Sequence, residues 1–360
     1  MSAELIKIDK NDPDQEAIRR AGEIILAGGL VAFPTETVYG LGGNALDPHA
    51  SEKIYAAKGR PSDNPLIVHI ADLAHLTPLV REIPPSATAL SERFWPGPLT
   101  MIFEKSPIVP YETTGGLDTV AVRFPSEPVA AALIRAAGGY VAAPSANTSG
   151  RPSPTTAQHV AEDLGDAIDM ILDDGPVGIG LESTIVDFTQ DPPCVLRPGY
   201  ISLTDLEEVL GLCSMDPGLT GENAQVHPKA PGMKYRHYAP KALMTIVEGD
   251  RDAVISRINR LAAQAKAEGK RTRILACEEN AGFYPPELCV CAGSRAREET
   301  IARHLYEKLR EFDELGTDVI FSEAFDTPRL GTAIMNRLVK AAGHRVIHAD
   351  GSDMAEKDTV

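Results

Sequence analysis

The sequence predicts an α/β protein of two domains, and three observations favour this fold class. The chain has 360 residues, which exceeds the size at which a single hydrophobic core usually keeps growing. Short β-rich runs alternate with helical stretches along most of its length. Its composition, with 43% hydrophobic and 24% charged residues, is that of an ordinary globular protein.

Residues 1–210 are predicted to form the first domain, with strands of mixed direction. An amphipathic helix is expected from about Asp14, and two further helices over 50–57 and 129–137. The β-rich runs that predict strands cover 29–38, 66–70, 99–103, 120–124, 140–143, 168–172 and 184–188.

Residues 211–240 lack periodicity and are rich in Gly, Pro, Asn and His, which predicts a linker. Structureless segments longer than ~12–15 residues are commonly either disordered or functional lids. A lid is favoured here because the segment contains an aromatic and cationic cluster, Lys234, Tyr235, Arg236, His237 and Tyr238.

Residues 241–349 are predicted to form a small three-layer, Rossmann-like domain with a parallel sheet. Residues 350–360 are expected to be a loose tail. The alternating strands and helices that support this domain are strands over 243–247, 273–276, 288–291 and 318–321, and helices over 252–268, 298–315 and 332–342.

The overall charge argues against nucleic acid as the main ligand. The formal net charge is −16, from 35 Lys and Arg against 51 Asp and Glu. Stable nucleic-acid binding depends on cationic groups that replace condensed counterions. The sequence therefore predicts a small-molecule ligand and no stable nucleic-acid binding.

Cysteine usage and the absence of long apolar runs predict a cytoplasmic protein without membrane association. The five cysteines include no C-x-x-C pair, so free thiols in a reducing compartment are expected. No apolar run approaches the ~20 residues that span a bilayer. The first residues, MSAELIKIDKNDPDQ, are too polar for a signal peptide.

The triplet Lys58-Gly59-Arg60 is the densest chemical signal in the chain. It follows a predicted helix and precedes the strand that carries His69. Two cations around a glycine at such a position suit the binding of phosphate or carboxylate. Taken alone, a solvated basic turn is the commoner explanation of such a triplet.

Small and polar residues gather at the ends of several other predicted strands. The strand end at Ala143 leads into Ser145, Asn147 and, further on, Ser153. Polar side chains next to apolar strands carry a desolvation cost unless a partner such as a ligand satisfies them. Similar segments are PTETVYGL (34–41), WPGPLT (95–100), ESTI (182–185) and LRPG (196–199).

Several familiar motifs are missing. The sequence contains no G-x-x-x-x-G-K-[ST], which excludes a P-loop NTPase. Residues 40–45, GLGGNA, lack the last glycine of a dinucleotide loop and are predicted to form a tight turn. No set of protein metal ligands is predicted either.

Taken together, these segments resemble a known family. PTETVYGLG, KGRPSDNPLIVHI, WPGPLT, GLDTVAVRFP, APSANTSGRPSPT, ESTIVDF and LRPG resemble the YrdC-type domain of threonylcarbamoyl-AMP synthases. APGMKYRHYAPK and GTAIMNRLVKAA are similar to the linker and C-terminal domain of its two-domain form. The resemblance implies a twisted mixed sheet with a large concave cavity, over which the linker closes.

The resemblance also implies roles for individual residues. Lys58 and Arg60 are implied to be catalytic and to hold the ATP phosphates. The implied threonine-binding residues are Thr35, His69, Arg123, Ala143 and Ser183. Lys58 and Arg60 are joined on the nucleotide side by Ser145, Asn147, Ser153, Arg197, Tyr235 and His237.

The implied reaction joins L-threonine, bicarbonate and ATP to give threonylcarbamoyl-AMP and pyrophosphate. Mg²⁺ is expected with ATP, as part of the substrate. A downstream tRNA threonylcarbamoyl transferase is the implied partner, which uses the product to form N6-threonylcarbamoyladenosine.

Two alternatives are weighed against this function. A YrdC-type domain with a concave basic surface also suggests a double-stranded RNA-binding module, which the net charge of −16 disfavours. A related domain occurs in hydrogenase-maturation carbamoyltransferases, but those chains are longer and carry acylphosphatase and zinc-finger segments. Neither segment is found in this sequence.

Overall fold

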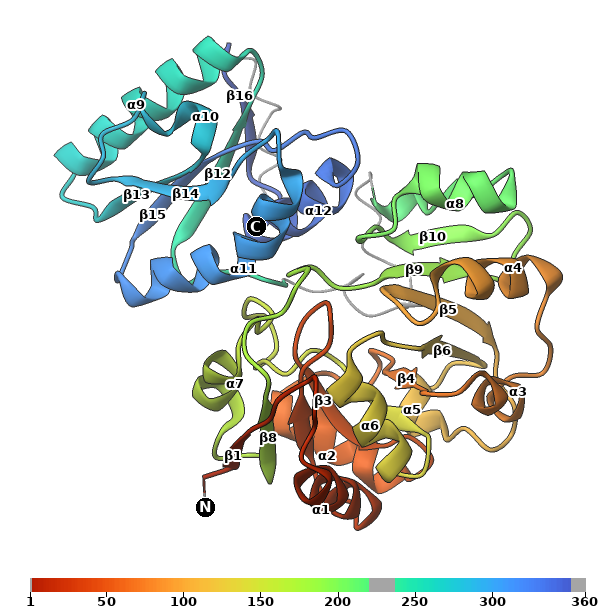
Figure 1. The fold of residues 1–360 in the computed structure, drawn as a ribbon. Helices are drawn as coiled ribbons and strands as arrows, with labels where there is room; N and C mark the ends of the chain where they lie inside the picture. Colours follow the sequence, from red (N-terminus) through yellow and green to blue (C-terminus); the bar gives the residue numbers. More distant parts are fainter. Residues whose placement is uncertain (1, 220–236, 351–360) are drawn as a thin grey trace. The chain divides into compact units, whose positions relative to one another are not determined.

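The computed structural model describes residues 2–219 and 237–350, which divide into two compact units. The first contains Met1–Ser149 and Ser153–Tyr235, and the second contains Gly150–Pro152 and Arg236–Val360. Each unit is built around one sheet (Figure 1). Among the helices described, none combines the length and apolar character needed to cross a membrane.

The first sheet has eleven strands, in the order β1-β8-β2-β3-β7-β4-β6-β5-β9-β10-β11. The sheet contains both parallel and antiparallel pairs: β4 runs parallel to β6, whereas β5 runs antiparallel to β6. The strands are β1 (Glu4–Lys7), β2 (Val31–Phe33), β3 (Gly40–Asn44), β4 (Ile67–His69), β5 (Leu99–Glu104), β6 (Thr119–Arg123), β7 (Val141–Ala142), β8 (Met170–Asp173), β9 (Thr184–Asp187), β10 (Cys194–Arg197) and β11 (Ser214–Met215).

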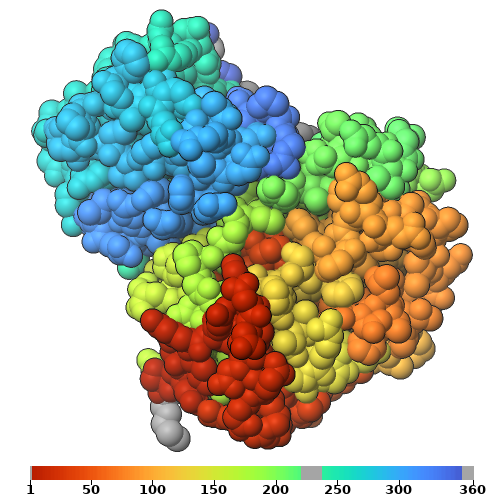
Figure 2. Space-filling view, in the orientation of Figure 1, coloured from red at the N-terminus to blue at the C-terminus, as the bar shows by residue number. Residues whose placement is uncertain are grey.

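Helices cover both faces of this sheet. α1 and α6 pack with Phe33 and Val141 on one face, whereas α2, α4 and α7 pack with Val68 and Val122 on the other. α4 also contacts α8, and their surfaces adjoin in the space-filling view (Figure 2). The helices are α1 (Gln15–Leu26), α2 (Pro48–Lys58), α3 (Leu76–Leu79), α4 (Pro85–Phe94), α5 (Tyr111–Thr114), α6 (Pro128–Ala136), α7 (Ala157–Leu164) and α8 (Leu203–Leu210), with 3₁₀ turns at Leu73–His75 and Pro217–Leu219.

Local sequence signals fix the ends of the helix that carries Lys58. The Asp47 side chain accepts a hydrogen bond from the backbone N–H of His49 at the start of α2, and Pro48 occupies its first turn. Gly59 ends the helix in the left-handed conformation, with φ of 59°. Lys58 is therefore the last helical residue, and the chain turns sharply after it.

Two predictions for residues 29–45 are wrong. The predicted strand over 29–38 is shorter, because β2 ends at Phe33 and the backbone bends over 36–38. Residues 40–44 form β3 instead of the predicted tight turn, antiparallel to β2. The glycines allow this close pairing, since a Cβ on Gly42 would lie 2.9 Å from side-chain atoms of Phe33 and Val141.

The second unit contains a five-stranded sheet in which every strand pair is parallel, in the order β14-β13-β15-β12-β16. α9 and α11 lie on opposite faces of it (Figure 1). The α/β fold class, with a large mixed sheet and a second parallel sheet, is confirmed. The elements are β12 (Leu243–Glu248), α9 (Arg251–Ala267), β13 (Thr272–Cys277), α10 (Glu278–Ala281), β14 (Cys289–Gly293), α11 (Glu298–Glu314), β15 (Val319–Glu323), α12 (Gly331–Ala341) and β16 (Val346–His348).

Candidate active site

Three polar residues lie side by side on one face of the first sheet. His69 pairs with Arg123 between β4 and β6, and Arg123 pairs with Thr100 between β6 and β5. Residues directly opposite each other in neighbouring strands point to the same face. The preceding residues, Val68 and Val122, point to the other face and belong to the main core. Strand alternation therefore places all three polar side chains on the face opposite that core.

His69 is a neutral imidazole in this environment. It is 3% exposed, and its Nδ1 lies 3.1 Å from the carbonyl oxygen of Ile67, which identifies Nδ1 as the protonated nitrogen. Its pKa is lowered to about 3, because burial disfavours the charged ring and Arg123 adds a nearby positive charge. His69 can therefore act as a hydrogen-bonding group and not as a cation near neutral pH.

Arg123 forms a buried ion pair with Glu36. Arg123 Nη2 lies 2.7 Å from Glu36 Oε1, and the two side chains are 5% and 13% exposed. Glu36 was not among the predicted site residues. It lies within PTETVYGL, but its partner is 87 residues away, so nothing in the local pattern identifies the contact.

Ser183 lies between Thr100 and Arg197. Its Oγ is 2.7 Å from Thr100 Oγ1 and accepts a hydrogen bond of 3.1 Å from Arg197 Nη2. Arg197 Nε also donates to the Ser183 carbonyl, at 3.1 Å. All three side chains are buried. This network extends the polar row from Arg123 to the end of β10.

Lys58 holds the loop that contains Ser145 and Asn147. Its Nζ donates to the carbonyl oxygens of both residues, and the side chain is almost fully buried. Ser145 Oγ in turn donates to Asn147 Oδ1, at 2.6 Å. The ammonium group is thus fixed against a loop of carbonyl and hydroxyl groups, which contradicts the solvated-turn explanation for Lys58.

Arg60 is held by the loop that follows it. Its Nη2 donates to the carbonyl oxygens of Asn64, at 3.2 Å, and Pro65, at 2.9 Å. The side chain is half-buried. An arginine guanidinium carries five N–H donors, an arrangement that suits a polyanion.

Residues 34–41 connect the Lys58 loop to the Arg123 ion pair. The backbone N–H of Leu41 donates to Pro144 O, and Ala146 N–H donates to Tyr39 O, both next to Ser145. Within the same segment, Thr35 Oγ1 accepts from the backbone N–H of Val38 and donates to its carbonyl. Residues 34–41 therefore link the loop that contains Ser145 to the ion pair between Arg123 and Glu36.

The other predicted site residues are Ala143, Ser153, Tyr235 and His237. Ala143 is buried, and its N–H donates to Ile67 O in β4. Ser153 Oγ donates to Glu182 Oε1, at 2.6 Å, beside Ser183. Tyr235 lies outside the described residues. His237 belongs to the second unit, where its ring lies 5.6 Å from that of Tyr238.

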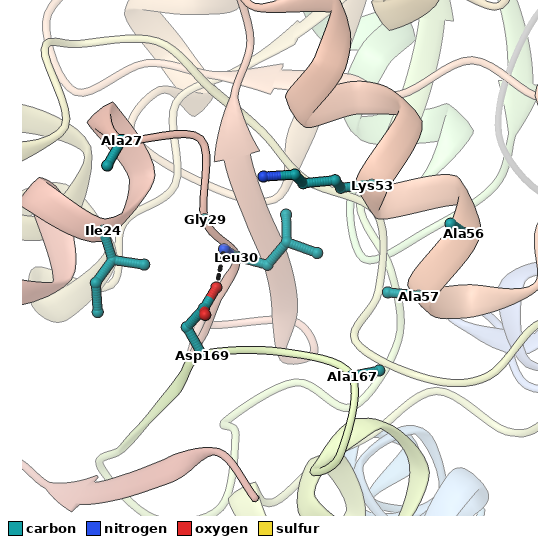
Figure 3. Close-up of a pocket in the computed structure, with 9 residues that line it drawn as sticks. All are labelled: Ile24, Ala27, Gly29, Leu30, Lys53, Ala56, Ala57, Ala167 and Asp169. Carbon is teal, nitrogen blue, oxygen red and sulfur yellow. Dashed lines mark hydrogen bonds between the residues drawn. The ribbon is translucent and has the colours of Figure 1, made fainter. Parts of the chain in front are cut away.

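A pocket of ≈ 670 Å³ in the first unit is lined by none of the predicted site residues that the structure describes (Figure 3). Its two charged side chains serve the backbone: Lys53 Nζ donates to Gly28 O at 2.6 Å, and Asp169 Oδ2 accepts from Leu30 N–H at 2.7 Å. It is lined by Ile24, Ala27, Gly29, Leu30, Lys53, Ala56, Ala57, Ala167 and Asp169.

Comparison with known proteins identifies the family. Residues 23–199 match the Sua5, YciO and YrdC family model, described as telomere recombination, and residues 201–343 match the threonylcarbamoyl-AMP synthase C-terminal domain. The chain is 50% identical to the threonylcarbamoyl-AMP synthase of Pyrococcus abyssi over 330 residues, which cover 92% of this chain and 95% of that protein. The chain belongs to the threonylcarbamoyl-AMP synthase family. The resemblance found in the sequence is thus confirmed.

Further relatives of this synthase family agree in sequence and in structure. The Bacillus subtilis threonylcarbamoyl-AMP synthase is 49% identical over 342 residues, or 95% of this chain and 96% of that protein. The crystal structure of P. abyssi Sua5 complexed with L-threonine superposes with a TM-score of 0.91 at 48% identity, covering 96% of this chain and 99% of that one. The family places the chain among enzymes that use ATP for adenylyl transfer.

Proposed function

We propose that this chain makes threonylcarbamoyl-AMP from L-threonine, bicarbonate and ATP, with release of pyrophosphate. The observation that carries the proposal is the match, at about 50% identity and over nearly full length, to relatives named threonylcarbamoyl-AMP synthase. The L-threonine bound in the P. abyssi structure supports threonine as the amino-acid substrate. Full-length agreement also disfavours the RNA-binding module and the longer carbamoyltransferases.

The row of polar side chains on the first sheet, formed by His69, Arg123, Thr100 and Ser183, suits binding of the amino acid. Arg123 is a buried guanidinium that can bind a carboxylate through two parallel hydrogen bonds. His69 and Ser183 add neutral hydrogen-bonding groups on either side of it. We assign threonine binding to the predicted set, Thr35, His69, Arg123, Ala143 and Ser183.

The loop around Lys58 suits the nucleotide. Phosphoryl and nucleotidyl transfers depend mainly on positioning and on neutralisation of charge. Lys58 and Arg60 supply two cations, and ATP brings Mg²⁺ with it as part of the substrate. We assign the nucleotide side to Lys58, Arg60, Ser145, Asn147, Ser153, Arg197, Tyr235 and His237.

The proposed reaction has two bond-forming steps. The threonine nitrogen attacks the carbon of carbon dioxide, formed from bicarbonate, and loses a proton to give a carbamate. A carbamate oxygen then attacks the α-phosphorus of ATP, and the bond from that phosphorus to the bridging oxygen of pyrophosphate breaks. Positioning both substrates in one site converts these steps into reactions between neighbouring groups.

Residues 211–240 are proposed to act as a lid over this site. Carbamates decompose readily in water, so exclusion of water protects the intermediate. A chain that ends after Leu219 keeps β11, which pairs with β10 in the first sheet, and is expected to lose most of its turnover. Unchanged turnover in this truncated chain would show that the lid and second unit are unnecessary.

The proposed product reacts further outside this chain. An acyl adenylate is an activated donor, and a tRNA threonylcarbamoyl transferase is the partner proposed to consume it in the cytoplasm. The net charge of −16 agrees with release of a small-molecule product and disfavours stable tRNA binding by this chain.

A direct assay tests the proposal. The full chain is incubated with ATP, Mg²⁺, bicarbonate and one amino acid at a time, and the adenylate and pyrophosphate are measured by mass spectrometry. Threonine-dependent adenylate is expected, and equal turnover with serine or glycine would refute the assigned substrate. Lys58→Ala and Arg60→Ala are each expected to lower the rate roughly 100-fold or more.

Lys53→Ala is the matched control for Lys58→Ala. Both lysines lie on α2, and each Nζ donates to backbone carbonyl oxygen, but Lys53 bonds to Gly28 away from the predicted site residues. The control is expected to keep the wild-type rate. Equal loss of activity in both variants would attribute the effect of Lys58 to α2 and not to the substrate.

A further inference from the structure

The ion pair between Arg123 and Glu36 leaves hydrogen-bonding atoms of both side chains unused. Glu36 Oε1 accepts from Arg123 Nη2 at 2.7 Å, but among the residues that the structure describes, Glu36 Oε2 and Arg123 Nε are buried without a hydrogen-bond partner. Removing two charges from water is costly, and full hydrogen bonding is what normally offsets that cost. One donor of the guanidinium and one acceptor of the carboxylate are therefore left unsatisfied within the same ion pair.

The backbone around Glu36 is held firmly, which fixes where the carboxylate can reach. Ile179 N–H donates to Glu36 O at 2.9 Å, and Gly180 N–H donates to Thr37 O at 3.0 Å. On the other side, Thr35 Oγ1 accepts from the N–H groups of Thr37 and Val38, at 3.2 and 3.3 Å. Glu36 is thus presented by a turn that is bonded on both sides.

The backbone of Arg123 is also fixed, by the strands on either side of it. It is the last residue of β6, between His69 of β4 and Thr100 of β5. Its side chain is 5% exposed. The unpaired donor and the unpaired acceptor are consequently positioned by the sheet and by a bonded turn before any ligand arrives, as a specific binding site requires.

An α-amino acid carries the complementary pair of charges. Its carboxylate accepts hydrogen bonds and its ammonium donates them, and the two groups are attached to the same carbon. We propose that Glu36 is a specificity residue that accepts the α-ammonium group of the amino-acid substrate, while Arg123 binds its carboxylate. The inference rests on the proposed function, because it takes threonine as the substrate.

This role explains why a carboxylate lies beside the guanidinium that must bind a substrate carboxylate. A simple anion would gain from Arg123 and be repelled by Glu36, whereas a zwitterion gains from both. The pair therefore selects amino acids over hydroxy acids and other carboxylates of the same shape, which is discrimination by an unfavourable contact as well as a favourable one.

The test compares threonine with its analogue (2S,3R)-2,3-dihydroxybutanoate, in which a hydroxyl replaces the ammonium. Binding of each to the full chain is measured by calorimetry, in wild type, Glu36→Gln and Glu36→Asp. Glu36→Gln is expected to weaken threonine binding about 10- to 100-fold and to leave the analogue's affinity unchanged or higher. Glu36→Asp keeps the charge and is expected to restore part of the preference for threonine.

Two controls separate this inference from a loss of fold. Glu36→Gln is expected to bind ATP as wild type does, and exposed Glu82→Gln is expected to bind both ligands as wild type does. Equal weakening of threonine and analogue would show that Glu36 only orients Arg123, and tighter threonine binding would show that it competes with the substrate carboxylate. Either result overturns the inference.

The proposed function fails in a different way. Wild type that binds no threonine and makes no adenylate would refute the synthase itself, whatever Glu36 does. Wild type that binds threonine and retains its preference after Glu36→Gln would refute only the role of Glu36.

Discussion

At the scale of single residues, burial decides which groups of the site carry charge. His69 and Arg123 are direct neighbours on the sheet, and both are almost fully buried. Burial disfavours a charged imidazole and the nearby Arg123 guanidinium adds to this effect, so the pKa of His69 drops to about 3. The site therefore presents one cation and one neutral ring to its ligand.

The His69 ring is expected not to titrate between about pH 5 and 8, where an ordinary histidine changes charge. The measurement is the imidazole NMR signal that disappears in His69→Gln, followed over this range. A titration midpoint between about 6 and 7 would contradict the buried, neutral ring.

The same pKa shift predicts how stability depends on acid. Below about pH 6.5 the unfolded chain protonates His69, while the folded chain does not until the pH approaches about 3. The unfolded state then binds more protons, so the free energy of unfolding falls as the pH falls, by up to about 1.4 kcal/mol per pH unit. The full stabilisation from His69 is present above about pH 6.5, and this pH dependence is expected to be absent in His69→Gln.

At the residue scale, the sequence predicted candidate cations for the site but not how they are held. Lys58 stood out because a lysine, a glycine and an arginine follow a helix directly. Its contacts with Ser145 and Asn147, 87 and 89 residues away, depend on the folded sheet. Glu36 was missed for the same reason, since its partner Arg123 is equally distant in sequence.

At the scale of elements, the end of β10 must approach the start of β9 closely. A Cβ on Gly199 would lie 2.4 Å from Thr184 N and 2.7 Å from Glu182 O, both backbone atoms that cannot move aside cheaply. Gly199 thereby allows the chain after Arg197 to pack against the segment that carries Ser183.

Gly199→Ala is expected to lower the free energy of unfolding of the first unit by about 1–3 kcal/mol, since overpacking shifts the backbone. The single tryptophan, Trp95, is buried in the first unit and reports its denaturation by fluorescence. Gly178→Ala is the matched control, because within the described part of the chain its Cβ would meet no atom closer than 3.9 Å. Equal effects from both substitutions would remove the close-approach argument.

α6 begins at a carboxyl group in an unfavourable position. Burial and the negative charge of Asp174 raise the pKa of Glu127 to about 7. The folded state therefore binds the extra proton, and stability falls as the pH rises from about 4.5 towards 7.

Glu127→Gln is expected to stabilise the first unit by roughly 1 kcal/mol at pH 8, where the Glu127 carboxyl is charged, and by little at pH 5, where it is protonated. The effect at pH 8 is no larger because partial exposure screens the charge. Denaturation followed at Trp95 checks this, with exposed Glu82→Gln as the control. A stabilisation that is the same at both pH values would show that the Glu127 charge is not its cause.

Element prediction succeeded where periodicity was strong and failed where glycine interfered. The helix from about Asp14 and the long helices of the second unit follow apolar stripes, as in α1 and α11. β3, with the sequence GLGGN, has few side chains to mark it as a strand. It forms because tight packing against Phe33 and Val141 needs its glycines.

At the scale of the whole molecule, the two sheets differ in strand direction and in the site residues that they carry. The polar row and the Lys58 loop both belong to the mixed sheet of the first unit, while the second unit carries a separate parallel sheet. Length and alternating elements predicted two domains, because each sheet has its own strand pattern.

The central claim is that ATP phosphates and an amino-acid carboxylate occupy one site, between Lys58 and Arg123. The most direct measurement is a crystal structure of the full chain with L-threonine and a non-hydrolysable ATP analogue. We expect the threonine carboxylate to lie within about 3.2 Å of the Arg123 guanidinium and the phosphates to lie against Lys58 and Arg60. Ligands bound in separate parts of the molecule, or threonine away from Arg123, would contradict it.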